Sequence, residues 1–506
     1  MALSRPCTAL FVLLAGVPLG ARAGFRCPAK GGLEWREYRS KHFVVDTDVA
    51  PSQVPFLIGQ LERIHVLELQ ALIGEQVEIP GHARVVAFAD QHLFTEVAGS
   101  AMLAAYFKYS KLREPMIVLP VDFGDQGESI AHEMAHHLSR FLFPQQPRWF
   151  SEGLAQFVQT VAVTRRSDAA PATGSHLVRS SRDERGSVGA APAYMQSALA
   201  TVPRLRLDDL LRWDGRLDRH AGKHYLFSWL LYHWLWNNRP KQFTAFQQRL
   251  SNGEDPSAAL RAEFPDMDAA NPAAVEKIED DIDRYRVGGR YVFYSVSAKP
   301  DAGFAAGPVL GSADVHMLLL AAAGHGFEEK ELRAELDEIL REDPTQPEAI
   351  VARAEIDKSS PLPLLRKSAA ARASDWRSSL LLGHALDGAS GEEKEAAYRK
   401  AVALNPDSSM ANESLARHLL SRGRAKEALP IANRAVDLVP ADPSAIDALA
   451  AVAAGLGKCS EALVLERRAA TIASSETDAG EEMKKRLAQV EARCTSPAPA
   501  AAAIAR

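Results

Sequence analysis

Two histidines and two glutamates carry the chemistry that this sequence can support. His132, Glu133 and His136 form an H-E-x-x-H pattern within residues 129–136. Residues four apart lie on one face of an α-helix, about one turn from each other, so the two imidazoles can bind a single metal ion. Glu133 is rotated away from that face, where it can take a proton from a metal-bound water. The pattern predicts a zinc-dependent hydrolase; the alternative is a solvated helix face with two satisfied histidines.

The second glutamate, Glu152, lies in the stretch 149–155, which is Trp-Phe-Ser-Glu-Gly-Leu-Ala. A catalytic zinc ion needs three protein ligands and one open position. Pro144 and Pro147 break the chain between the two motifs, so a second helix can reverse direction and present Glu152 to the metal. We therefore expect one Zn²⁺ per chain, bound by Glu152 and the two motif histidines.

Residues 129–157 resemble the gluzincin branch of zinc metallopeptidases, in the peptidase MA-like superfamily. In aminopeptidases of that branch, the sequence around the third ligand is similar to the Trp-Phe-Ser-Glu-Gly-Leu-Ala stretch. The resemblance implies a zincin-like fold, with His132, His136 and Glu152 as zinc ligands. It also implies that Glu133 is the general base for the hydrolysis of peptide bonds. The chain lacks the Gly-Ala-Met-Glu-Asn signature with which those aminopeptidases bind the amino terminus of a substrate.

Three further segments are candidates for roles around the metal. Members of the gluzincin branch commonly place a Tyr or His near the developing oxyanion, and Tyr225, with His224 behind it, is the candidate here. Tyr225 can equally be a core aromatic residue of an amphipathic helix. His137 is expected to point away from the ligands, as a surface or outer-sphere residue. The strand at 116–119 is either an edge that pairs with an extended peptide or an ordinary buried strand.

The elements that must position these residues alternate between strands and helices up to residue 123 and are mostly helical after Glu152. The expected fold is therefore an α+β zincin-like catalytic domain followed by an all-α helical-repeat domain. The predicted elements are strands at 42–49, 84–88, 104–109 and 116–119, a helix at 52–73, the motif helix at 128–143, and helices at 207–211 and 224–236. The predicted divisions are a sheet lobe at 40–123 and a helical lobe at 148–295 within a domain at 24–295, a surface loop at 167–189, a boundary segment at 298–311, and repeats at 312–494.

The repeat domain rests on a period of 34 residues. Leu-Asn-Pro at 404–406 returns as Leu-Val-Pro at 438–440, and the run at 423–429 returns in similar form at 457–463. This is the period of tetratricopeptide repeats, of which 336–344 is expected to be an earlier, degenerate unit. A non-repetitive helical bundle with a chance echo is the alternative. Such repeats build grooves that bind peptides or proteins, so a protein partner is expected there.

Composition and the two termini indicate where the protein acts. The net charge of −5 over 506 residues, with mixed signs, does not point to nucleic acid. Arg5, an apolar run at 9–19 and an Ala-Arg-Ala sequence predict a signal peptide over 1–23, cleaved near Ala23, and a periplasmic or extracellular protein. An uncleaved membrane anchor is the alternative, and no later segment is apolar enough to span a membrane. Residues 495–506 are rich in Ala and Pro and predict a disordered tail.

Four cysteines are present, of which Cys7 would leave with the signal peptide. Cys459 and Cys494 flank the last helical hairpin and are the best candidates for a disulfide in an oxidising compartment. Cys27 is then unpaired in the chain, either free or bonded to another molecule. Three unpaired buried thiols are the alternative.

Together these features predict a secreted or periplasmic zinc metallopeptidase that cleaves a peptide or protein substrate. Two alternatives stay open: a catalytically silent zincin-like scaffold that acts through its repeats, and a hydrolase of a non-peptide amide such as a cell-wall component. The presence of Glu133 favours an enzyme, because a degraded site can tolerate any residue at that position.

Overall fold

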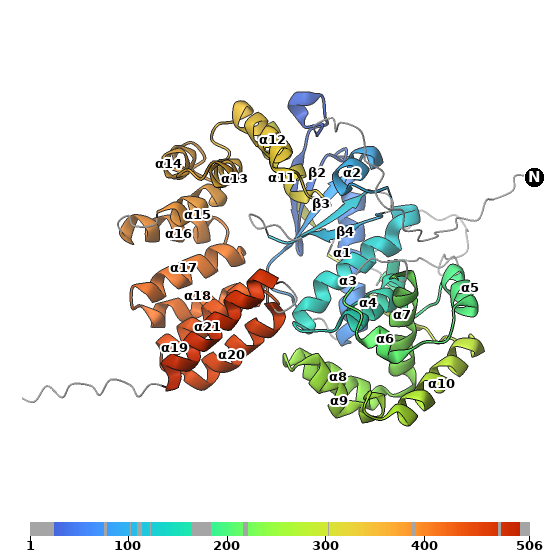
Figure 1. Cartoon of the computed structure of the whole chain (residues 1–506). Coiled ribbons are helices and arrows are strands. Elements are labelled where there is room, and N and C mark those ends of the chain that lie inside the picture. Colours follow the sequence, from blue (N-terminus) through green and yellow to red (C-terminus); the bar gives the residue numbers. More distant parts are fainter. Residues whose placement is uncertain are drawn as a thin grey trace, which may run out of the picture.

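The computed structural model describes residues 25–74, 78–101, 103–108, 114–121, 123–162, 184–215, 221–301, 303–386, 391–473 and 477–495. The predicted signal peptide, the first part of the predicted surface loop and nearly all of the predicted tail lie outside these ranges. Among the described helices, none combines the length and the apolar character that crossing a membrane requires. Figure 1 shows a half built on a β-sheet beside an arc of paired helices.

The N-terminal half is built on a six-stranded mixed sheet with the order β4-β5-β3-β2-β1-β8. β2, β3 and β5 run parallel, whereas β1, β4 and β8 pair antiparallel with their neighbours. β5 lies between β3 and β4, so the possibility that 116–119 is an exposed edge is wrong, and β4 is the edge on that side. The strands are β1 (Arg36–Ser40), β2 (Phe43–Thr47), β3 (Ala83–Phe88), β4 (Tyr106–Lys108), β5 (Met116–Pro120) and β8 (Phe304–Val309).

Helices cover both faces of this sheet, because side chains alternate between the faces along each strand. Val85 and Ala87 of β3 join a core with α1 (Val54–Ile73) and with α3 (Phe123–Leu142), the helix of the H-E-x-x-H motif. Val86 and Phe88 face the other way and join a second core with α2 (Gln91–Ala98) and α11 (Ser312–Ala322). Inner strands that are buried on both faces have nearly continuous apolar sequences, which is why these strands were evident from sequence.

The segment predicted as a boundary, 298–311, is part of the sheet half instead. It contains β8, which pairs with β1 along the outer edge of the sheet, and α11 then packs against the sheet from the following residues. The end of the predicted surface loop is also structured, because β6 (Glu184–Val188) pairs with β7 (Tyr294–Ala298) in a two-stranded ribbon. Residues on both sides of the predicted boundary therefore share one hydrophobic core.

A helical lobe built largely of aromatic side chains follows the motif helix. Phe150 and Phe157 of α4 both pack against Tyr232 of α7, and Trp149 stacks on Phe246 of α8 with ring centroids 6.0 Å apart. The helices of this lobe are α4 (Arg148–Val158), α5 (Ala193–Thr201), α6 (Leu207–Leu211), α7 (Ala221–Asn238), α8 (Pro240–Ser251), α9 (Pro256–Glu263) and α10 (Pro272–Gly288), with the short 3₁₀ helix η2 (Gln159–Ala162) after α4.

The C-terminal half is an arc of antiparallel helix pairs (Figure 1). α17 (Ser409–Ser421) and α19 (Pro443–Gly455) begin 34 residues apart, and so do α18 (Ala425–Leu438) and α20 (Cys459–Ala473). The predicted helical repeat is therefore confirmed. A disulfide joins Cys459 to Cys494 of α21 (Thr477–Thr495), as predicted, and Cys27 is a buried free thiol. The earlier helices of the arc are α12 (Glu329–Glu342), α13 (Pro347–Asp357), α14 (Leu362–Ala371), α15 (Trp376–Ala385) and α16 (Gly391–Leu404).

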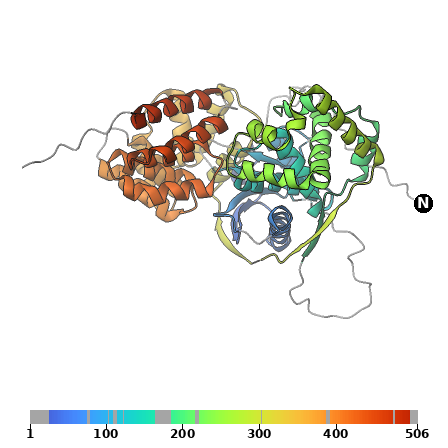
Figure 2. The ribbon, with the colours of Figure 1, turned by 90° about the horizontal axis from the view of Figure 1, so that it is seen from below.

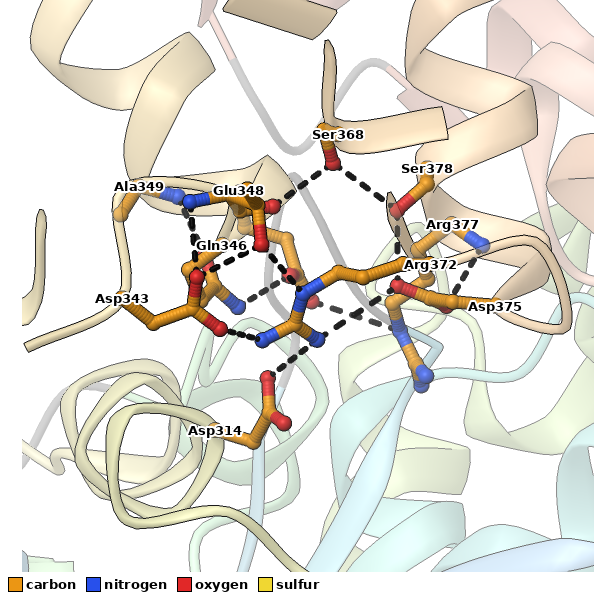
Figure 3. A network of polar contacts seen from close by, with 11 residues as sticks. Asp314, Asp343, Gln346, Glu348, Ala349, Ser368, Arg372, Asp375, Arg377 and Ser378 are labelled. Atoms are coloured by element: carbon orange, nitrogen blue, oxygen red, sulfur yellow. Dashed lines mark hydrogen bonds and ion pairs between the residues drawn. The ribbon is translucent and has the colours of Figure 1, made fainter. Parts of the chain in front are cut away.

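The arc is fastened to the sheet half by polar contacts near its start. Arg372, between α14 and α15, forms ion pairs with Asp314 of α11 at 2.9 Å and with Asp343 at the end of α12 (Figure 3). Arg377 of α15 lies 3.4 Å from the buried Glu348 and 3.7 Å from Glu114 of the sheet half. The charges of both arginines are thus compensated across helix boundaries, which orients the first repeats on the sheet.

A second contact closes the arc onto the sheet half, and Figure 2 shows the two halves adjoining. His82, just before β3, approaches Asp407 in the loop between α16 and α17, with His82 Nδ1 2.8 Å from Asp407 Oδ2. A cavity of about 60 Å³ lies at this junction, lined from the sheet half by His65 and His137 and from the repeats by Pro440. His137 directly follows His136 on α3, so the motif helix and the repeats line the same cavity.

Candidate metal centre

The two histidines and Glu152 come together as the sequence predicts. His132 and His136 stand one turn apart on α3, with ring centroids 4.7 Å from each other. α3 ends at Leu142 and α4 begins at Arg148, so the chain reverses at the two predicted prolines. Glu152 Oε2 then lies 3.2 Å from His132 Nε2 and 3.5 Å from His136 Nε2. The two Nε2 atoms are 3.1 Å apart.

These three atoms lie 3.1–3.5 Å apart, which is within about 0.2 Å of the spacing of ligands around a tetrahedral zinc ion. Ligand atoms at tetrahedral angles and about 2.0–2.2 Å from zinc lie about 3.3–3.6 Å from one another. Glu152 is 1% exposed, and its Oε2 has no hydrogen-bond partner. A buried carboxylate oxygen without a partner is costly, and a cation between the three atoms would remove that cost. In the described part of the chain, this is the one group of three or more candidate ligands within such reach.

Contacts on the other side of each imidazole turn the Nε2 atoms toward Glu152. Gln159 Oε1, in η2, lies 3.0 Å from His132 Nδ1, and because an amide oxygen only accepts, Nδ1 carries the hydrogen. Ser151 Oγ lies 3.1 Å from His136 Nδ1. Metal-binding histidines usually donate their second nitrogen in this way, which fixes both the tautomer and the ring orientation. The imidazoles are thus oriented for binding through Nε2.

The electrostatics of the cluster favour an added positive charge. Burial alone would raise the pKa of Glu152, but the two imidazoles that face it hold that pKa well below its usual range. Burial opposes a charge on His132, yet its contacts with Glu152 and the nearby Glu133 raise its pKa above the ordinary value. The carboxylate therefore stays ionised, and the array attracts either a proton or a metal cation.

The close packing of α4 against α7 fixes the position of Glu152 relative to the two histidines. A Cβ atom on Gly153 would lie 2.5 Å from the backbone oxygen of Ser228 and 2.7 Å from Tyr232 Cβ, so no larger residue fits here without movement. Gln156 Nε2 donates to the backbone oxygen of Tyr225 at 2.9 Å and joins the two helices again one turn later. The same crossing therefore positions both Glu152 and the start of α7.

The other predicted site residues lie on α3 and α7. Glu133 is partly buried on α3; it is outside the group of three converging ligands and acts electrostatically on Tyr225. Tyr225 is partly buried at the start of α7, and burial raises the pKa of its phenol. His224 stacks on Trp213 with ring centroids 5.1 Å apart. His137 faces away from the cluster, as predicted; it is partly exposed and lies against Phe107 and Phe141 in the cavity beside the repeats.

Three residues at the site were missed at the sequence level. Arg148 forms an ion pair with Glu152 Oε1, with Nη2 at 2.5 Å. Its signal is the four-residue spacing, which places an arginine and a glutamate side by side on a helix. Ser151 is adjacent to Glu152 in sequence and carries no separate signal. Gln159 lies in η2 after α4 has ended, so helical periodicity does not indicate that it reaches α3.

No protein-family model matches the chain, and a search of curated proteins finds no relative. Several solved structures are similar to about a third of it. They include TTC0263, a thermophilic TPR protein of Thermus thermophilus, at 18% identity over 34% of this chain and 96% of that chain, with a TM-score of 0.28. YrrB, described as a TPR protein with an unusual peptide-binding site, is 17% identical over 31% of this chain and 90% of its own, with a TM-score of 0.24. MamA from Desulfovibrio magneticus RS-1 is 18% identical over 33% and 96%, with a TM-score of 0.21.

Proposed function

We propose that this protein is a zinc-dependent peptidase with a helical-repeat domain that binds protein. The observation that carries the proposal is the convergence of three Lewis-basic atoms, the Nε2 atoms of His132 and His136 and Oε2 of Glu152, at 3.1–3.5 Å. The outward hydrogen bond of His132 to Gln159 and the unpartnered, buried Oε2 support a cation at their centre.

The residues around the cluster have distinct tasks in such an enzyme. A bound zinc ion supplies Lewis acidity, which polarises a carbonyl group and lowers the pKa of a water molecule. Glu133 takes the proton of the attacking water on its carboxylate and returns it to the leaving amine. Tyr225 keeps its phenolic proton, because burial raises its pKa, and donates a hydrogen bond to the oxygen of the reacting carbonyl.

The proposed substrate is a peptide or a protein, in keeping with the resemblance of residues 129–157 to gluzincin metallopeptidases. The repeat domain supports this substrate class, because stacked helix pairs offer extended surfaces on which a polypeptide can bind. The signal peptide predicted over 1–23 assigns the enzyme to the periplasm or the cell exterior. There the disulfide between Cys459 and Cys494 is stable.

The test combines metal content with turnover. Elemental analysis of the purified protein should find one zinc per chain, and His132→Gln should abolish it. His92→Gln is the matched control, because His92 is a 70% exposed histidine on α2 and should leave the metal content unchanged. Glu133→Gln should retain zinc and lose the cleavage of an unfolded protein substrate.

Each outcome separates one alternative. Absence of zinc from the wild-type protein would overturn the proposal. One zinc without cleavage of any polypeptide would favour the scaffold, and cleavage of cell-wall amides alone would favour the non-peptide hydrolase.

A further inference from the structure

Arg148 is a partly exposed cation in direct contact with a candidate metal ligand. It is the first residue of α4 and lies one helical turn before Glu152. Its Nη2 atom is 2.5 Å from Glu152 Oε1, while Glu152 Oε2 faces the two histidines. The guanidinium therefore occupies one carboxylate oxygen, and only the other is directed at the metal position.

The same guanidinium forms a hydrogen bond with the side chain of Tyr225 on α7. Arginine carries donors only, so the phenolic oxygen of Tyr225 accepts this bond and its own hydrogen points away from Arg148. Glu133 acts electrostatically on both Arg148 and Tyr225, so the proposed general base is near enough to both side chains to interact with them. One cation thus contacts both a candidate metal ligand and the candidate oxyanion donor.

The surroundings of Arg148 hold the guanidinium in place. It lies over the ring of Trp213, with Cζ 5.9 Å from the ring centroid. Gly215 has a φ of +88°, and a Cβ atom there would lie 2.8 Å from Arg148 Nε, so the backbone of this loop packs directly on the side chain. A planar guanidinium can donate in two directions at once, whereas a lysine ammonium is a single point of charge.

We propose that Arg148 is a positioning residue that sets Glu152 as a one-oxygen metal ligand and aims the hydroxyl of Tyr225 at the reacting carbonyl. The inference rests on the proposed zinc-dependent activity and adds a residue to it. A role limited to the stability of α4 would not affect zinc affinity and turnover in the pattern that follows.

Zinc affinity is measured by competition with a chromophoric chelator. Arg148→Met should bind zinc about 10- to 100-fold more weakly than wild type, as expected for loss of a partner that orients a ligand. Arg148→Lys keeps the charge and should lose less, which provides a variant that folds if the methionine does not. Arg212→Met is the control. Arg212 also forms an ion pair with an acidic residue four positions away, Asp208, at 2.7 Å, but its side chain is 74% exposed.

Turnover gives a second, independent reading. In the chelator competition, Tyr225→Phe should bind zinc with wild-type affinity. With saturating zinc, the same variant should lower kcat more than it changes KM. Arg148→Met combined with Tyr225→Phe should lose less in kcat than the product of the two single losses, because both changes disable the same donor.

Two results would overturn the inference while leaving the proposed function intact. One is a folded Arg148→Met or Arg148→Lys variant with wild-type zinc affinity. The other is independent, multiplicative effects of Arg148→Met and Tyr225→Phe on kcat. A wild-type protein that binds no zinc would overturn both the inference and the proposed function, so the two failures are distinguishable.

Discussion

Replacing Gly153 with alanine tests how strictly the crossing of α4 and α7 positions the candidate metal centre. The added Cβ would lie 2.5 Å from the backbone oxygen of Ser228, whereas ordinary contacts begin at 3.4 Å. The helices must therefore separate by about 0.9 Å at this point, because a backbone oxygen within α7 cannot rotate away. Such overpacking costs about 1–3 kcal/mol, which lowers the melting temperature of a domain of this size by about 2–12 °C.

The shift also reaches Glu152, the candidate metal ligand. Glu152 directly precedes Gly153, and a metal site tolerates displacements of about 0.2 Å in its ligand distances. Gly153→Ala should therefore weaken zinc binding as well as lower stability, although alanine favours a helix over glycine by about 1 kcal/mol.

Thermal unfolding with excess chelator and with excess zinc measures both effects. Gly127→Ala is the matched control, since it lies in α3 and its Cβ would meet only Ala162 Cβ, at an ordinary 3.5 Å. The control should be neutral or slightly stabilised, with wild-type zinc affinity. A Gly153→Ala variant that unfolds at the temperature of the control and binds zinc equally well would contradict this prediction.

Further predictions concern the hydrogen bonds around the candidate metal centre, the pH dependence of stability and the disulfide. Gln159→Leu removes the acceptor for His132 Nδ1 and should weaken zinc binding about 10- to 100-fold in chelator competition; an unchanged affinity would contradict this role. Burial, with a nearby carboxylate, raises the pKa of Glu466 to about 8 from an ordinary 4.5. The unfolded chain then loses this proton first, so stability should fall as the pH rises from about 4.5 to about 8. Glu466→Gln should remove that fall in denaturant titrations, and an identical pH profile would refute the assignment. The disulfide between Cys459 and Cys494 spans 35 residues, so replacing both cysteines with serine should destabilise the last repeats by about 3–4 kcal/mol. Faster proteolysis of α21 is the expected readout, and wild-type resistance would count against it.

Local periodicity explains what could be predicted about the fold. Inner strands that are buried on both faces can be recognised as apolar runs. Candidate ligands four positions apart can be recognised as lying on one face of a helix. The role of 298–311 could not be predicted in this way, because pairing of β8 with β1 joins residues separated by more than 260 positions in sequence. Pro and Gly in that segment predicted a domain boundary. In the structure, part of the segment forms β8, which pairs with the otherwise unpaired edge of β1.

The sequence by itself determined the spacing of His132 and His136, the helix break before Glu152 and the 34-residue repeat, and it made Cys459 and Cys494 the best candidates for a disulfide. These features depend on neighbours within one or two elements, where helix geometry and chain continuity leave little choice.

Only the tertiary structure decided the contacts between distant elements. In the structure, β5 is an inner strand, Gly153 packs closely against α7, and Arg148 contacts both Glu152 and Tyr225. The physical reason is that close packing and hydrogen-bond direction between elements depend on how whole helices and strands are oriented, and residue spacing along the chain does not record that orientation.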